Sequence, residues 1–133
     1  MKVGLETSVL MRLLSGDPED LALVALRYLW EREQAGDRIL VSDWVLAETY
    51  YALQQHYGLS KKESLDALRD FLATPNVEST GVAAEILTIS NLESAKPGFI
   101  DRLIYRNYLS SGAAHMATFE KASAKLPHVQ LLT

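Results

Sequence analysis

The sequence predicts an α/β fold, a three-layer α/β/α sandwich built on a mostly parallel sheet of four to five strands. Short apolar runs alternate with longer amphipathic stretches along the chain, the pattern typical of repeated strand–helix units. Parallel strands need long crossover connections, and helices usually supply them. At 133 residues the chain is long enough for one core, and no linker or repeat divides it. We therefore expect one domain over residues 1–133.

Composition is that of an ordinary globular protein and excludes several kinds of chemistry. Hydrophobic residues make up 48% of the sequence and charged residues 23%. There is no cysteine, which excludes disulfides, thiolate zinc sites and cysteine nucleophiles. Glu6 interrupts the apolar run at the amino terminus, and no uncharged run approaches the roughly 20 residues that span a bilayer. We therefore expect a cytoplasmic protein with no membrane partner.

The net charge of −4 argues against a nucleic-acid partner if the acidic residues are spread over the surface. Carboxylates gathered around a divalent cation have the opposite effect, because the metal reverses the local field and attracts phosphates. Charge alone leaves both interpretations open.

Strands and helices are predicted to alternate from one end of the chain to the other. Asp17, ahead of Pro18, is typical of a helix start, and Asp43 is expected to cap a later helix. Ser60 and Glu63 match a capping box. The expected strands cover residues 2–5, 38–42, 77–79, part of 113–119, and 129–132. The expected helices cover residues 7–14, 18–36, 44–57, 61–73, 82–94, 99–111 and 120–125.

Four carboxylates occupy positions that point to a metal site. Glu6 and Glu120 each follow a predicted strand, and the carboxyl ends of parallel strands are where ligands bind in open α/β sheets. Glu48 lies in an apolar helix stripe, where burial is costly without a partner. Asp101 opens the penultimate helix. Ligand sets made only of oxygen suit hard cations such as Mg²⁺ or Mn²⁺.

Each of these acids also has an ordinary structural interpretation. Glu6 and Glu120 would be solvated loop residues or helix caps. Glu48 would pair with a lysine or arginine of another element. Asp101 would stabilise its helix dipole by up to about 1 kcal/mol. It is the order of the four acids along an α/β chain, rather than any one of them, that favours a metal site.

Four segments of the sequence, taken in order, resemble the PIN domain family. Residues 3–10, Val-Gly-Leu-Glu-Thr-Ser-Val-Leu, resemble the family's opening Asp-Thr-Asn-Val-Leu. Residues 41–48, Val-Ser-Asp-Trp-Val-Leu-Ala-Glu, resemble its Val-Ser-x-x-Val-x-x-Glu segment. Residues 99–104, Phe-Ile-Asp-Arg-Leu-Ile, are similar to its Phe-x-Asp-x-Leu-Ile, and residues 117–121, Ala-Thr-Phe-Glu-Lys, to its Thr-Phe-Asp-Lys. The spacing matches over essentially the whole chain, and the sequence looks most like the VapC-like toxins of toxin–antitoxin pairs.

The resemblance implies a function and a set of site residues. It implies a Mg²⁺- or Mn²⁺-dependent endoribonuclease that hydrolyses RNA and serves as the toxin of such a pair. The implied partners are RNA, a cognate antitoxin protein and a second copy of the chain, as a homodimer. Ser8 and Thr118 would support the site, and Arg102 would contact a phosphate or lie on a solvated face. By position, the catalytic and metal-binding residues would be Glu6, Glu48, Asp101 and Glu120.

The sequence departs from the family pattern at positions 6 and 120, where glutamate replaces the usual aspartate. Each glutamate adds one methylene, about 1.5 Å of bond length, and a misplacement near 1 Å costs on the order of a hundredfold in rate. A second hypothesis is therefore a catalytically impaired PIN-like module that binds RNA or a protein partner. A third, a receiver-like signalling domain, needs an aspartate after a central strand, and the third predicted strand offers only Glu78.

Overall fold

The computed structural model describes residues 1–133 and contains two parallel sheets rather than one. The larger sheet has the strand order β1 (Lys2–Gly4), β2 (Arg38–Val41), β3 (Val77–Ser79). The smaller sheet pairs β4 (Met116–Thr118) with β5 (Val129–Leu131). All the pairings are parallel. The predicted α/β class with parallel strands is confirmed, whereas the prediction of one sheet of four to five strands is wrong.

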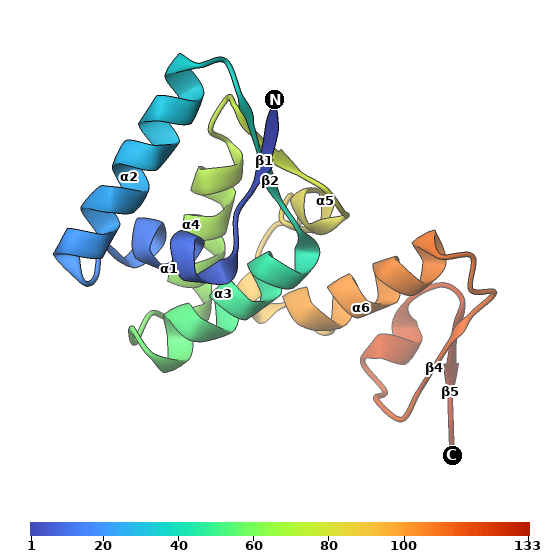
Figure 1. Cartoon of the computed structure of the whole chain (residues 1–133). Coiled ribbons are helices and arrows are strands. Elements are labelled where there is room, and N and C mark those ends of the chain that lie inside the picture. Colours follow the sequence, from blue (N-terminus) through green and yellow to red (C-terminus); the bar gives the residue numbers. More distant parts are fainter.

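Helices flank the three-stranded sheet. Figure 1 shows α2 and α4 to the left of β1 and β2, and α5 to the right. The α-helices are α1 (Thr7–Ser15), α2 (Glu19–Gln34), α3 (Asp43–Gln55), α4 (Lys61–Leu72), α5 (Ala83–Ile86) and α6 (Phe99–Ser110), and the 3₁₀ helices are η1 (Leu92–Ser94) and η2 (Ser123–Lys125).

The start of α4 follows the predicted chemistry, whereas the start of α3 does not. The capping box at the start of α4 is confirmed, because the Glu63 amide donates to Ser60 Oγ at 3.0 Å and the Ser60 amide donates to Glu63 Oε1 at 2.9 Å. The prediction that Asp43 caps α3 is wrong. Ser42 is the cap, its hydroxyl accepting a hydrogen bond from the Val45 amide at 3.2 Å. Asp43 is the first residue of α3, and its carboxylate accepts hydrogen bonds from other elements of the fold.

Two other predicted helices are shorter than expected, and α2 begins one residue later. Residues 82–94 form only the single turn of α5 and then η1, because Asn91 adopts a left-handed conformation (φ 56°) that no continuous helix contains. Of residues 120–125, only Ser123–Lys125 are helical, as a 3₁₀ turn. At the start of α2, Pro18 takes the cap position and leaves Asp17 outside the helix.

The core lies where the helices pack on the three-stranded sheet. Strand β2 is central, and its Ile39 and Val41 are fully buried. From α3 the core receives Leu46 and Tyr50. The last member of the core cluster along the chain is Leu103, so nothing after α6 belongs to this core.

After α6 the chain forms a separate C-terminal unit, residues 111–133. Figure 1 shows this unit beside the distal half of α6, away from the three-stranded sheet. Tyr105 of α6 ties the unit to the helix, because its hydroxyl donates to the Pro127 carbonyl at 2.8 Å. Helix α6 has 12 residues, roughly 18 Å at the usual rise, and it carries β4 away from β1. This placement is the physical reason why one predicted sheet becomes two.

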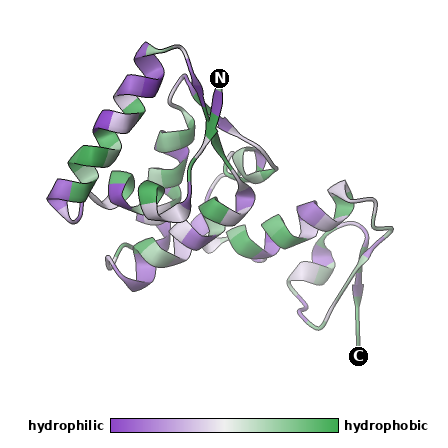
Figure 2. Ribbon diagram, in the orientation of Figure 1, coloured by the Kyte–Doolittle hydropathy of each residue, from purple (hydrophilic) through white to green (hydrophobic).

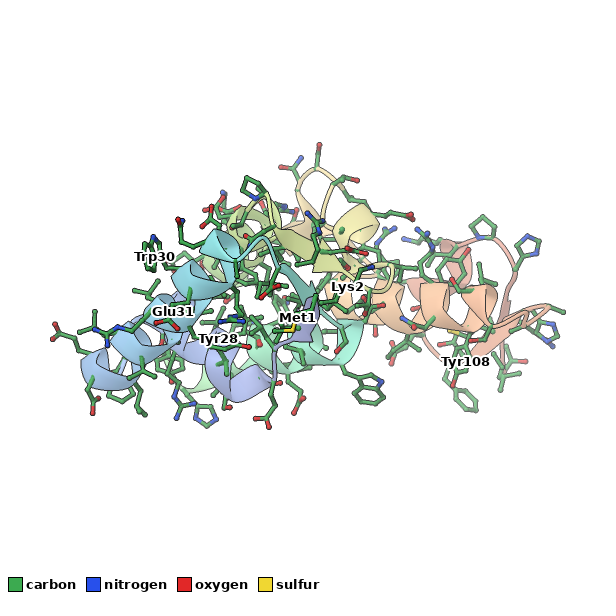
Figure 3. All side chains as sticks on the ribbon, turned by 45° about the horizontal axis from the view of Figure 1, so that its top comes forward. Met1, Lys2, Tyr28, Trp30, Glu31 and Tyr108 are labelled. Carbon is green, nitrogen blue, oxygen red and sulfur yellow. The ribbon has the colours of Figure 1, made fainter.

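Helix α2 turns its small residues inward and its large apolar residues outward. Ala22 and Ala25 are buried, while Leu23 is 57% exposed and Trp30 is 61% exposed. Figure 2 shows hydrophobic positions along the α2 ribbon, and Figure 3 shows Trp30 projecting from it. The exposed face is apolar, yet no helix of the structure has the length and hydrophobicity needed to cross a bilayer.

Asp37, between α2 and β2, is a buried carboxylate held by two cations. It is 6% exposed, and its oxygens accept hydrogen bonds from the Met1 ammonium and from Arg32 Nη1, each at 2.9 Å. The hydrogen bond from the amino-terminal ammonium, together with the charges of that group and of Arg32, lowers the pKa of Asp37 below its ordinary value of 3.8.

This lowered pKa predicts a pH-dependent contribution to stability. A depressed carboxyl pKa stabilises the fold above the unfolded-state value of 3.8 and loses that effect as pH falls through the folded-state pKa. We expect Asp37→Asn to be less stable than the wild type at pH 7, and the gap to close below pH 3.8. Urea unfolding of both proteins, with free amino termini, at pH 7 and pH 3 measures the gap. An equal gap at both pH values contradicts the prediction.

Candidate active site

Two of the four predicted carboxylates, Glu6 and Glu48, line one pocket of about 510 Å³ between α1 and α3. Glu6 is the N-cap residue of α1, but its side chain makes no capping hydrogen bond. Glu48 lies in the second turn of α3, where its Oε1 accepts a hydrogen bond from the Thr7 hydroxyl at 3.0 Å. The carboxylate of Glu6 is thus not used as a helix cap. We call this site the α1–α3 pocket.

Strand pairing explains why these two acids meet. In the parallel register of β1 with β2, Gly4 is opposite Leu40, and the Leu5 amide donates to the Leu40 carbonyl at 3.0 Å. Both strands therefore end at the same edge of the sheet. Glu6 follows β1 and Leu5 at this edge, and α3 starts there after β2. The carboxyl edge of a parallel sheet is the usual place for a ligand site in α/β proteins.

Glu48 is exposed, which corrects the expectation that its apolar helix stripe would bury it. The two large aromatic residues of that stripe face solvent, since Trp44 is 81% exposed and Tyr51 is 52% exposed. The core-facing side of α3 is instead formed by residues such as Leu46 and Leu53, both fully buried. The Glu48 carboxylate therefore stays hydrated and needs no buried cation as a partner.

The other two predicted carboxylates lie apart from the α1–α3 pocket. Asp101 is exposed in the first turn of α6, and Glu120 is exposed after β4 in the C-terminal unit. Neither lines the pocket. No three histidine, cysteine, aspartate or glutamate side chains come close enough together to hold a metal ion. The structure thus brings together two of the four acids.

The supporting residues are placed as follows. Ser8 lines the α1–α3 pocket beside Glu6. Thr118 Oγ1 accepts a hydrogen bond from the Glu120 amide at 2.9 Å, which fixes the turn that starts at the end of β4. Arg102 is tied to its own loop, because its Nε donates to the Pro97 carbonyl at 2.7 Å.

The donors of the α1–α3 pocket suit a hard divalent cation. Two carboxylates and the Thr7 hydroxyl face the same space, and all of them offer oxygen. In proteins Mg²⁺ is commonly bound by one or two carboxylates, while waters and phosphate oxygens complete its coordination. The residues present therefore fit a magnesium-like ion as an anchoring pair.

A larger cleft of about 610 Å³ lies between α3 and α6 and shares Glu48 with the α1–α3 pocket. Its walls are mainly apolar, with Trp44 on one side and Ile104 and Tyr108 on the other. Figure 3 shows Tyr108 on α6, well away from Met1 at the start of β1. Asp101 lies between lining residues of α6 in the sequence but is not itself one of them. Glu48 stands at the junction of the two hollows.

Sequence reasoning missed the structural role of Asp43. Its carboxylate accepts hydrogen bonds from the Val82 and Ala83 amides, each at 3.1 Å, and from Asn107 Nδ2 at 3.0 Å. One side chain thus joins α3, α5 and α6. A Cβ at Gly81 would overlap this carboxylate. An acid in the first turn of a helix is typical of a cap, so the sequence carried no signal for these distant partners.

Comparison with known proteins identifies one family. The family model described as the PIN domain matches residues 3–129, which include all four predicted acids. No curated protein and no solved structure matched the chain.

Proposed function

Because the chain belongs to the PIN domain family, whose members are generally nucleases, we propose that it is a metal-dependent endoribonuclease. Its substrate is RNA, and it acts as the VapC-like toxin of a toxin–antitoxin pair in the cytoplasm. Its protein partners are a cognate antitoxin and a second copy of the chain. The observation that carries the proposal is the α1–α3 pocket, where Glu6 and Glu48 line one hollow at the carboxyl edge of a parallel sheet.

Glu6 and Glu48 would hold Mg²⁺ or Mn²⁺ through their carboxylate oxygens, and Asp101 and Glu120 would complete the set. When bound, the ion supplies an activated water and stabilises charge that develops on the phosphodiester. The Thr7 hydroxyl orients the Glu48 carboxylate through its 3.0 Å hydrogen bond.

The other named residues would position these acids and the substrate. Ser8 borders Glu6 in the pocket. Thr118 fixes the backbone at Glu120. Arg102 would contact a phosphate through the guanidinium nitrogens that Pro97 does not use.

An RNA cleavage assay with and without divalent metal tests the proposal. Cleavage is expected with Mn²⁺ or Mg²⁺, is expected to be abolished by EDTA, and is expected to return when metal is added in excess. Asp101→Asn is expected to lower the rate on the order of a hundredfold, because a metal-binding carboxylate is replaced by a neutral amide. Cleavage that is independent of metal, or full activity in this variant, would contradict the proposal.

A catalytically impaired module that binds RNA or a protein is the second candidate function. It is favoured by the extra methylene at positions 6 and 120 and by the separation of Glu120 from the α1–α3 pocket. The double variant Glu6→Asp, Glu120→Asp separates the two candidates. If only the double variant cleaves RNA, the natural site is impaired. If the wild type cleaves at least as fast, the site is built for glutamate.

A further inference from the structure

We propose that two copies of the chain exchange their C-terminal units, so that β4 of each copy pairs in parallel with β1 of the other and completes the active site. The role given to the acids rests on the proposed function. The exchange itself rests on strand edges, burial and the path of α6.

Both strands have an unpaired edge. β1 stands at the end of the order β1-β2-β3, and β4 pairs only with β5. An unpaired edge presents a row of backbone N–H and C=O groups that another chain can complete. Both strands have three residues and already take part in parallel pairing. The two edges are therefore matched in length and in mode of pairing.

The residues after the two strands match in kind and spacing. β1 is followed by Leu5 and Glu6, and β4 is followed by Phe119 and Glu120. Leu5 is 7% exposed, whereas Phe119 is 77% exposed. If the strand ends are aligned, Phe119 lies beside Leu5 and Glu120 lies beside Glu6, at the usual spacing of about 4.8 Å between paired strands. The pairing covers the exposed ring and brings a third carboxylate to the α1–α3 pocket.

The C-terminal unit has no core of its own. Within residues 111–133 only Ser123 is buried. Parallel sheets are normally covered on both faces, and an isolated pair of strands is marginally stable in water. The unit therefore needs further contacts, and a three-stranded parallel sheet with a free edge supplies them.

The path of α6 favours a second copy over the same chain as the partner. Phe99 at the start of α6 is 2% exposed and packs edge-on against Tyr50, with ring centroids 5.1 Å apart. At the middle of the helix, the Tyr105–Pro127 hydrogen bond holds the C-terminal unit on α6. Figures 1 and 3 show this unit far from the start of β1 in the same chain. The β1 edge of a second copy has no such constraint, and reciprocal exchange closes a two-fold dimer.

In the exchanged dimer, each active site contains residues of both copies. Glu6 and Glu48 come from one copy and Glu120 from the other, while Asp101 stays with the body that anchors the start of α6. Like charges at short range repel each other, so a divalent cation between them would stabilise the dimer. Dimer formation and metal binding are therefore coupled.

Cysteine cross-linking tests the exchange without reference to activity. The chain has no cysteine, so introduced thiols report only the designed contact. Val3→Cys lies at the β1 edge, and Ala117→Cys lies at the middle of β4. The two variants, carrying tags of different size, are refolded together and oxidised, and we expect a covalent product that contains one copy of each. The matched control replaces Val3→Cys with Glu78→Cys on β3, at the opposite edge, and is expected to give none.

The remaining measurements separate exchange from closure within one chain. Light scattering is expected to give twice the chain mass. The double variant Val3→Cys, Ala117→Cys is expected to cross-link between chains. If it cross-links only within a single chain, the unit closes on its own β1 and the proposal is overturned. A monomeric mass in the presence of Mn²⁺ also overturns it.

Complementation links the exchange to the site. Glu6→Gln and Glu120→Gln are each expected to be inactive alone. In a mixed exchanged dimer, one of the two sites contains neither substitution, so refolding the two together is expected to restore about a quarter of the wild-type activity. No restoration beside an active wild type overturns the composite site. A wild type without any nuclease activity refutes the proposed function and leaves the cross-linking result to decide the exchange.

Discussion

Glu48→Gln is expected to lower the rate of RNA cleavage about a hundredfold or more and to leave the fold intact. Glu48 is the one acid that lines both the α1–α3 pocket and the cleft between α3 and α6. Glutamine keeps the size of the side chain and still accepts the Thr7 hydrogen bond, but it removes the negative charge that binds a cation. Because Glu48 is exposed, the substitution leaves no buried polar group without a hydrogen-bond partner.

Glu85→Gln is the matched control for Glu48→Gln. Glu85 is also an exposed helical glutamate, paired with Arg106, and it lines neither the pocket nor the cleft. Cleavage of a labelled RNA in Mn²⁺ and thermal unfolding are measured for both variants. An equal loss of activity in the two variants, or full activity in Glu48→Gln, contradicts the role given to Glu48.

Gly81→Ala is expected to lower the free energy of unfolding by about 2–3 kcal/mol. The new methyl group would occupy the space of the Asp43 carboxylate and force it away from the Val82 and Ala83 amides and from Asn107. A hydrogen bond to a charged group contributes about 1.5–3 kcal/mol, and water replaces part of what is lost at this half-exposed site. The backbone of Gly81 has no positive φ, so the expected effect is steric.

Two controls isolate this effect. Gly98→Ala places a methyl group in ordinary contact with the Ala95 carbonyl, 3.6 Å away, and is expected to change stability by less than about 1 kcal/mol. A double-mutant cycle with Asp43→Ala removes the carboxylate, after which Gly81→Ala is expected to cost little. Urea unfolding measures all the variants. If Gly81→Ala costs the same with and without Asp43, the clash does not cause the loss.

The sequence predicted the positions of all five strands, although β3, with the sequence Val-Glu-Ser, is not an apolar run. It could not predict how they pair. Strands of three or four residues carry almost no information on their neighbours, and pairing depends on where the preceding helix leaves the chain. Helix α6 places β4 away from the three-stranded sheet, and residues 99–110 carry no sequence signal for this placement.

The candidate site was predictable where local rules apply and not elsewhere. The meeting of Glu6 with Glu48 follows from parallel strands that end at one edge. The participation of Asp101 and Glu120 stays a prediction, since it depends on the position of α6 and the C-terminal unit. The exposure of Glu48 was missed because Trp44 and Tyr51 resemble a core stripe, and only packing shows that Leu46 and Leu53 form the core side of α3.

The carboxylate of Asp43 links the position of α6 to the position of α3. Asn107, near the distal end of that helix, is bonded to the first residue of α3, the helix that carries Glu48. A displacement of the C-terminal unit is therefore transmitted through α6 and this hydrogen bond to the start of α3. If α6 tilts when the C-terminal unit passes from its own copy to a second copy, the start of α3 would shift with it. The position of residues 111–133 and the orientation of the helix that carries Glu48 are thus linked through a single side-chain contact.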